Sequence, residues 1–253
     1  MKSFYVSDLD GTLLRDDLSL SDYTRRELAA LIHEGVPLTI ASARSIYSIR
    51  PRLGRLPFRL PIIEANGAFV TDYSTGRKEM VRSIDRKAVR AALRAISAAG
   101  CMPFVSGHGK RGDFLCYGDL INPGMEYYVR QRKRDRDQRL RHADDMEAVL
   151  NAPGAAVTCV SVIDRAETLE ELAMKIRGAA GDDLSCTLFE FREFPGWHFF
   201  TLHDRLATKD HAIRFIREKW NLKDVELVVF GDDANDEGMF RIADRAVATA
   251  NAK

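Results

Sequence analysis

The sequence predicts an α/β protein in which a doubly wound parallel sheet is interrupted by a smaller α+β unit. Two observations predict this class. Near both ends of the chain, short apolar runs alternate with amphipathic stretches, which is the rhythm of βαβ units. Between them the rhythm changes to hairpin-like strands mixed with helices. We therefore expect one core built from residues 1–83 and 188–253, with residues 84–187 inserted as a unit that has its own small core.

The composition is that of a globular protein with no strong electrostatic partner. The chain has 253 residues, of which 45% are hydrophobic and 30% charged, and its net charge is +1. A charge so close to zero gives no field toward nucleic acid or an acidic membrane. No apolar run approaches the ~20 residues of a spanning helix, and the first apolar run starts too early to follow a signal peptide. We expect a cytoplasmic monomer or homodimer with no nucleic-acid or membrane partner.

The four cysteines do not form a redox or zinc motif. Cys101, Cys116, Cys159 and Cys186 lie in or beside apolar runs, and none belongs to a Cys-x-x-Cys pair. A disulfide framework is rare in a protein of this size and compartment. We expect four reduced core residues.

The first predicted strand ends in two carboxylates. The apolar run from Phe4 stops at Asp8, and Asp10 lies two positions further. Residues i and i+2 of a strand point to the same side, so the two acids converge. Such acids repel each other unless a cation lies between them, and hard divalent cations prefer oxygen ligands. The segment predicts half of a Mg²⁺ site; the alternative is a strand-end turn with solvated acids.

Each further element follows from apolar spacing and its boundary residues. The first region predicts helices from Ser19 or Ser21 to Gly35 and from Ser45 to Leu53, and strands at 36–41 and 62–63, which end at Ser42 and Glu64. The inserted unit predicts helices at 85–100, from about 124, and at 166–176, a hairpin of 101–106 with 114–117, and strands at 155–163 and 185–191. The last region predicts strands at 197–202, 225–230 and 246–249, and helices after Thr208 and through Met239.

The polar ends of three apolar runs are expected to meet at one edge of the parallel sheet. They are Asp8 with Asp10, then Ser42, then the segment from Asp232 to Asp236. Lys209 lies at a predicted helix start, where the helix dipole disfavours a cation. Alone, Ser42 is an ordinary strand-end serine and Lys209 a solvated lysine. Together these groups match phosphoryl transfer, which needs a nucleophile, an acid, hydrogen-bond donors and a metal cage.

The same segments resemble the haloacid dehalogenase superfamily, specifically its Cof-type phosphatases with a Rossmann-like core. Asp8–Leu14 resembles the first motif, Ala41–Ser45 the second, Glu64–Ala68 the Asn-Gly-Ala signature, Thr208–Asp210 the third, and Gly231–Asp236 with Met239 the fourth. Their order implies a cap domain between the second and third motifs. Two positions depart from the usual pattern, because Ala43 and Asp210 replace glycines.

The resemblance implies a catalytic role for each matching residue. Asp8 attacks phosphorus and becomes an aspartyl phosphate, while Asp10 protonates the leaving oxygen and then activates water. Ser42 and Lys209 bind the phosphoryl oxygens. Mg²⁺ is held by the Asp8 carboxylate, the Asp10 backbone carbonyl and Asp232.

Other matching residues are implied to support the site or to contact substrate. Asn235 and Asp236 are expected to hold the metal site or Lys209. Arg44 either contacts substrate phosphate or pairs with an acid, and Asn66 with Gly67 either contacts substrate or shapes a turn. Because Asp10 is present, phosphate ester hydrolysis is favoured over dehalogenation.

The sequence thus predicts a Mg²⁺-dependent phosphatase of small phosphorylated metabolites, with sugar phosphates as the first candidate substrates. Two alternatives stay open: a phosphosugar mutase with the same cap, and an inactive phosphometabolite-binding regulator. Cap residues that could select the leaving group are His108, Lys110, Arg111, Trp197 and His198, although a plain surface or core role is the simpler interpretation of each. The basic run 130–141 is expected to be a solvated helix face.

Overall fold

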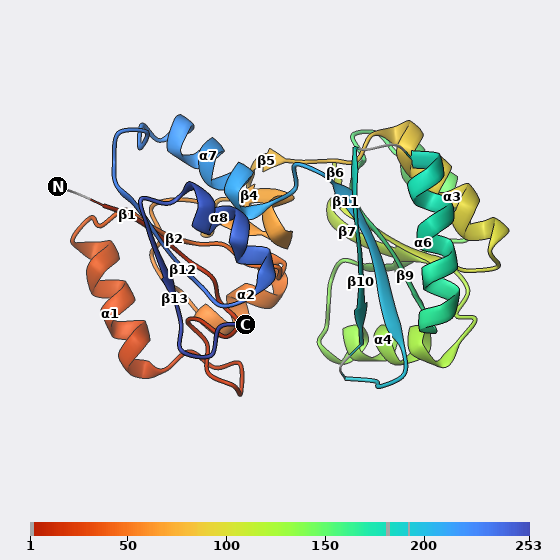
Figure 1. Ribbon diagram of the computed structural model, residues 1–253, viewed down its shortest axis with the longest axis horizontal. Helices are drawn as coiled ribbons and strands as arrows, with labels where there is room; N and C mark the ends of the chain where they lie inside the picture. Colours follow the sequence, from red (N-terminus) through yellow and green to blue (C-terminus); the bar gives the residue numbers. More distant parts are fainter. Residues whose placement is uncertain (1–2, 181–182, 192) are drawn as a thin grey trace. The chain divides into compact units, whose positions relative to one another are not determined.

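The computed structural model describes residues 3–180, 183–191 and 193–253. It divides the chain into two compact units, one made of the residues up to Arg82 and from Leu206 on, the other of Ser83–Arg205. The predicted fold class, an α/β core with an inserted α+β unit, is confirmed. The elements of each unit can be followed by their labels in Figure 1.

The predicted second boundary, at 187/188, is wrong. Strands β10 (Leu184–Glu190) and β11 (His198–Asp204) pair antiparallel along their whole length, and β11 also pairs antiparallel with β9 (Ala156–Asp164). The apolar run at 197–202 therefore belongs to the second unit, which continues to Arg205. An apolar run predicts a strand but does not reveal which strand will pair with it.

The central sheet of the first unit is entirely parallel. Its order is β13-β12-β1-β2. The strands are β1 (Phe4–Ser7), β2 (Leu38–Ile40), β12 (Leu227–Gly231) and β13 (Arg245–Ala248). Ser7 lies level with both Ile40 and Phe230, so the residues that follow these three strands emerge at one edge.

A small antiparallel sheet continues the first unit beyond β2. It contains β3 (Ile62–Glu64), β4 (Phe69–Thr71) and β5 (Lys78–Val81) in that order. Ala41, directly after β2, forms a parallel bridge to Ile63 in β3. The turn after β3 is thereby placed beside the end of β2.

Helices bury apolar side chains on both faces of the parallel sheet. The helices are α1 (Asp22–His33), α2 (Ile46–Leu53), α7 (Lys209–Lys219) and α8 (Glu237–Ile242). Apolar residues of α1 and α2 share one core, and those of α7 and α8 share the other with Phe4, Val6 and Val229. Of the two candidate caps of α1, Ser21 accepts the hydrogen bond from Thr24 N.

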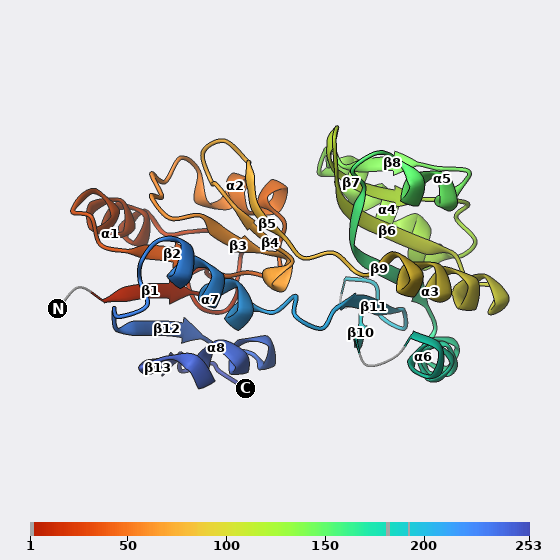
Figure 2. The same cartoon turned by 90° about the horizontal axis from the view of Figure 1, so that it is seen from above.

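The second unit is one six-stranded sheet with helices on both faces (Figure 2). Its order is β10-β11-β9-β6-β7-β8, with β6 (Pro103–Gly109), β7 (Gly112–Tyr117) and β8 (Leu140–His142). The helices are α3 (Arg86–Ala98), α4 (Pro123–Arg134), α5 (Met146–Asn151) and α6 (Ala166–Ala180). Residues alternate along β7, so Phe114 and Cys116 join the core of α3 and α6, whereas Leu115 and Tyr117 join the core of α4.

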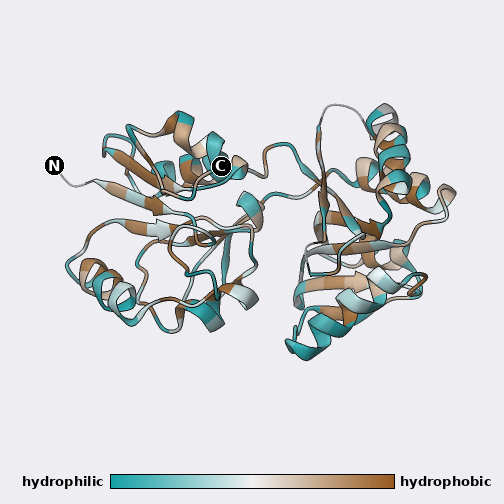
Figure 3. Cartoon of the chain, turned by 60° about the horizontal axis from the view of Figure 1, so that its bottom comes forward, coloured by the Kyte–Doolittle hydropathy of each residue, from teal (hydrophilic) through white to brown (hydrophobic). Residues whose placement is uncertain are grey.

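The hydropathy of the chain follows this architecture. In Figure 3 the strands are mostly hydrophobic, whereas the outer turns of the helices are hydrophilic. The four cysteines are free thiols, as predicted, with Cys101 and Cys116 buried. Among the residues described, we find no helix with the length and apolar character needed to cross a membrane.

Candidate active site

Asp8 begins the site directly after β1. Its backbone N–H donates to Phe230 O at 2.9 Å, which continues the parallel pairing one residue past the strand and fixes the carboxylate at the sheet edge. The residue is only 5% exposed. A buried carboxylate needs compensation by a donor or a cation.

Lys209 supplies that compensation from the first turn of α7. Its Nζ donates to Asp8 Oδ1 and to Asp236 Oδ1, each at 2.7 Å, and its side chain is 1% exposed. Lys209 does lie at a helix N-terminus, where the helix dipole disfavours a cation. Its two buried carboxylate partners offset this unfavourable interaction. One ammonium between two carboxylates leaves the cluster with a net charge of −1.

The pKa of Asp8 reflects its burial first and its charged neighbours second. Burial raises the pKa of the Asp8 carboxyl from 3.8 to about 6, while Lys209 opposes the rise and Asp236 adds to it. A group poised near neutral pH is typical of functional sites. Any further cation beside Asp8 favours its ionised form.

Asp8, Asp232 and Asp236 form a cluster whose donor atoms can hold a metal ion, with one oxygen of each within 4.8 Å of the others. The three are not equivalent. Both oxygens of Asp236 are already engaged, Oδ1 by Lys209 and Oδ2 by the backbone N–H groups of Asp232 and Asp233 at 2.9 and 3.2 Å. In the part of the chain that the structure describes, no hydrogen bond reaches Oδ2 of Asp8 or Oδ2 of Asp232. The donor set therefore fits a hard cation between Asp8 and Asp232, with Asp236 as their support.

The turn after Asp10 orients Asp232. Thr12 Oγ1 donates to Asp232 Oδ1 at 2.9 Å. Gly11 has φ = +75°, and a Cβ atom at this position would collide with the Asp232 carboxylate. The Gly-Thr pair is thus needed both for the turn and for the approach of the acidic side chain.

Asp10 forms an ion pair with Arg44. Arg44 Nε donates to Asp10 Oδ2 and Nη2 to Asp10 Oδ1, both at 2.7 Å. Of the two roles left open for Arg44, the structure shows the pairing with an acid. The side chains are 22% and 38% exposed, so both groups lie within reach of solvent.

Ser42 follows β2 and is fully buried. Its Oγ accepts from Arg44 N at 3.1 Å, and its own N–H donates to Ile63 O at 3.0 Å. The oxygen therefore has a fixed place at the start of the loop that carries Arg44, on the strand next to β1. The hydroxyl proton has no assigned acceptor in the described residues.

Asn66 and Gly67 tie three segments of the site together. Asn66 N donates to Ser42 O at 3.0 Å, and its side-chain oxygen accepts from Asn235 Nδ2 at 3.0 Å. Gly67 has φ = +101°, and any Cβ atom there would overlap Thr208 O, directly before Lys209. Of the two interpretations of this pair, these contacts match turn shaping and positioning.

Sequence reasoning missed the role of Glu64. Its fully buried carboxylate accepts from Lys78 Nζ at 2.5 Å, from Thr71 Oγ1, and from the backbone N–H of Ile46 at the start of α2. It thus anchors the helix that follows the Ser42–Arg44 loop. The sequence does hold a signal for this role, because a charged residue at the end of an apolar strand needs a buried partner. The Asn-Gly pair that follows Glu64 is the more familiar motif, and it was interpreted in place of Glu64.

The comparisons with known proteins agree with this site. Residues 5–253 match the family described as haloacid dehalogenase-like hydrolases. The chain belongs to this family. Phosphatase YwpJ of Bacillus subtilis is 24% identical over 266 residues, which cover 97% of this chain and 88% of that protein. The 5-amino-6-(5-phospho-D-ribitylamino)uracil phosphatase YitU of the same organism is 25% identical over 259 residues, covering 96% and 85%.

Solved structures of the family share the fold. The crystal structure of TM0651 from Thermotoga maritima superposes with a TM-score of 0.77 at 28% identity and covers 100% of this chain and 88% of that one. These findings confirm the predicted superfamily and the predicted enzyme class, a phosphoric monoester hydrolase. The Cof-type assignment stays a prediction.

Proposed function

We propose that this chain is a Mg²⁺-dependent phosphatase that hydrolyses small phosphorylated metabolites, sugar phosphates first, through an aspartyl phosphate on Asp8. The observation that carries the proposal is the buried Asp8 carboxylate, held by Lys209 at the edge of the parallel sheet. A binding protein has no need for the second acid, Asp10. The substrate class is supported by the YitU relative, whose name gives a phosphorylated ribityl compound.

Asp8 is positioned for nucleophilic attack. Lys209 holds Asp8 Oδ1 at 2.7 Å, and Asp8 Oδ2 accepts no hydrogen bond from the described residues. In the first step an Asp8 oxygen bonds to phosphorus as the bond from phosphorus to the leaving oxygen breaks. Lys209 and the Ser42 hydroxyl then stabilise the charge on the phosphoryl oxygens. In the second step water attacks phosphorus and Asp8 is released as a carboxylate.

Asp10 serves as the acid and then the base. Such a group typically contributes about 10²–10⁴-fold to the rate. Both oxygens of Asp10 accept from Arg44 in this structure. Asp10 must therefore exchange one of these bonds before it can give a proton to a leaving group, and the entering phosphate is the anion that can take Arg44 from it.

A Mg²⁺ ion would be held by the Asp8 carboxylate, the Asp10 backbone carbonyl and Asp232, supported by Asp236 and Thr12. When bound, it neutralises charge on the phosphoryl group. A metal ion in the cluster of Asp8, Asp232 and Asp236 agrees with the general use of a metal by hydrolases of this superfamily. The identity of the ion as Mg²⁺ is part of the proposal.

Phosphate release from a panel of sugar phosphates, nucleotides and phosphorylated cofactors, with Mg²⁺ and with EDTA, tests the proposal. We expect release that depends on Mg²⁺ and is highest for sugar phosphates. Isomerised sugar phosphate without free phosphate would instead indicate a mutase. Binding of these compounds with no product of either kind would indicate a regulator.

A further inference from the structure

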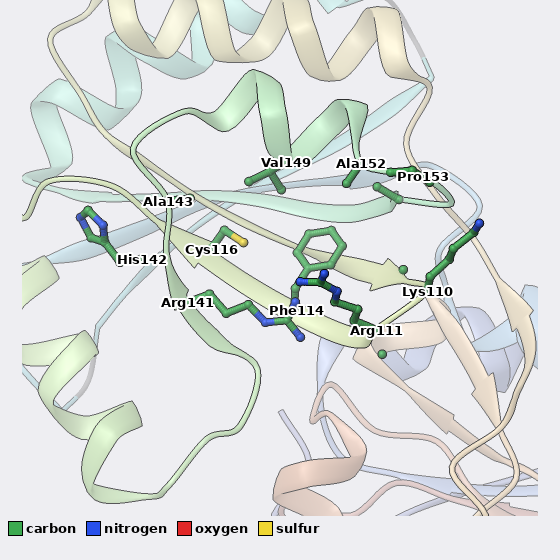
Figure 4. A pocket seen from close by; sticks show the side chains of 13 residues that line it. Lys110, Arg111, Phe114, Cys116, Arg141, His142, Ala143, Val149, Ala152 and Pro153 are labelled. Atoms are coloured by element: carbon green, nitrogen blue, oxygen red, sulfur yellow. The ribbon is translucent and has the colours of Figure 1, made fainter.

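The second unit contains a cavity of its own, of about 580 Å³ (Figure 4). It lies between the β6–β7 turn, the end of β8 and the segment around α5, and all of its 13 lining residues belong to this unit. Ligand sites of small molecules typically measure about 300–1,000 Å³. The cavity is thus large enough for a compound of mononucleotide size.

The floor of the cavity is apolar. Phe114 and Cys116 point into it from one face of β7, and Val149 closes it from α5. Burial raises the pKa of the Cys116 thiol, so this residue is neutral and adds to the apolar surface. Phe114 is 6% and Cys116 5% exposed, so most of their surface packs in the core and only the remainder lines the cavity. An apolar ring that enters the cavity would be removed from water against this floor.

The rim of the cavity is basic. Lys110 and Arg111 form the two-residue turn between β6 and β7, and Arg141 lies on β8 directly beside Cys116. None of the 13 lining residues is acidic. In Figure 4 Arg111 and Arg141 extend alongside the Phe114 ring.

These three cations are not compensated by the protein. Within the described part of the chain, no carboxylate lies within 4.0 Å of their charged groups; the one hydrogen bond that positions them runs from Arg141 Nη2 to Asp113 O at 3.3 Å. Three other arginines of the same unit are paired: Arg90 with Glu147, Arg132 with Asp135 and Arg139 with Asp137. Like charges gathered over an apolar floor without a counter-ion favour an anionic ligand.

We infer that this cavity binds a phosphate-bearing ring compound of the mononucleotide class, with the phosphate on Arg141, Lys110 and Arg111 and the ring on the apolar floor of Phe114, Cys116 and Val149. The inference does not depend on the phosphatase reaction. It names a ligand site that the residues of the second unit build among themselves.

Isothermal titration of the full-length Asp8→Asn chain tests this inference, in EDTA so that no hydrolysis occurs. The probes are AMP, ribose 5-phosphate and adenosine. We expect AMP to bind most tightly, because only AMP offers both the phosphate and the ring. Adding Arg141→Ala should weaken AMP binding at least about tenfold, as expected for loss of one charge-assisted contact to phosphate.

Two further variants separate this cavity from any other anion site. Ala152→Trp adds bulk at an exposed position that lines the cavity, and it should abolish AMP binding without removing a charge. Arg130→Ala, on the exposed part of α4 outside the cavity, removes the same charge as Arg141→Ala and should leave AMP binding unchanged. AMP binding that survives both Arg141→Ala and Ala152→Trp would overturn the inference, as would no AMP binding at all or equal binding of AMP and ribose 5-phosphate. Absence of phosphate release by the wild-type chain would defeat the proposed function but leave this result standing.

Discussion

The site around Asp8 in the first unit and the cavity of the second unit differ in how their positive charges are compensated. In the first unit Lys209 is 1% exposed and lies between two carboxylates at 2.7 Å. In the second, Lys110, Arg111 and Arg141 are exposed around a cavity with no acidic lining residue. A buried charge has to be compensated within the fold, because desolvation is costly. An exposed group can stay uncompensated, so it remains available to an anion from solution.

The largest expected effect comes from replacing Asp8, the proposed nucleophile of the first site. Asp8→Asn keeps the shape of the side chain but removes its negative charge, and an amide cannot form the aspartyl phosphate. We expect phosphate release to fall by about 10⁴-fold or more, with an unchanged circular dichroism spectrum. Activity close to that of the wild type would overturn the assignment of Asp8.

Removing the buried cation should cost stability rather than only activity. Lys209→Met leaves Asp8 and Asp236 facing each other in a buried site, and breaking a buried pair in this way typically costs about 3–5 kcal/mol. Urea unfolding measures the loss. The matched control is Lys223→Met, since Lys223 pairs with Glu218 at 2.9 Å on the surface, with side chains 64% and 71% exposed. Exposed pairs contribute about 0–1 kcal/mol, so equal losses in the two variants would contradict the distinction.

The pH dependence of stability gives a further test of how the buried Asp8 carboxylate is compensated. The pKa of Asp8 is raised from 3.8 to about 6 in the folded state. Between these values the folded chain retains a proton that the unfolded chain has released, so raising the pH lowers stability. The loss is complete above pH 6 and amounts to about 3 kcal/mol at 1.36 kcal/mol per pKa unit.

An asparagine at position 8 has no carboxyl proton to lose, so its contribution to stability does not change with pH. In EDTA, Asp8→Asn should therefore unfold at higher urea concentration than the wild type at pH 7, and the difference should disappear near pH 4. A difference that is constant across this range, or has the opposite sign, would show that Lys209 already compensates both acids.

Much of the first unit could be predicted from the sequence, because parallel strands end at one edge of a sheet and each of three apolar runs is followed by a polar residue. This rule alone predicts that Asp8, Ser42 and Asp232 lie at the same edge of the sheet. The pairing of the 197–202 run could not be predicted, since an apolar strand has the same pattern in a parallel or an antiparallel sheet.

Side-chain pairing was also beyond the sequence. Nothing in the spacing of Asp236 indicates that its Oδ1 faces Lys209 while its Oδ2 accepts two backbone N–H groups. The cavity of the second unit depends in the same way on β7 and β8 being neighbours, which places Arg141 beside Cys116. These contacts arise from packing between segments far apart in the chain.

The smallest expected effect concerns Arg44, which is paired with Asp10 and is still reachable from solvent. If the entering phosphate takes Arg44 from Asp10, Arg44→Ala removes a contact to phosphate and also frees Asp10. The loss of the phosphate contact should raise KM, and the release of Asp10 should leave kcat within about tenfold of the wild type, because the acid itself remains.

Asp10→Asn should do the opposite, with kcat falling about 10²–10⁴-fold. Arg44→Ala should therefore change mainly KM, and Asp10→Asn mainly kcat. A large fall in kcat with unchanged KM for Arg44→Ala would show that Arg44 stays paired with Asp10 throughout the reaction and does not move to the phosphate.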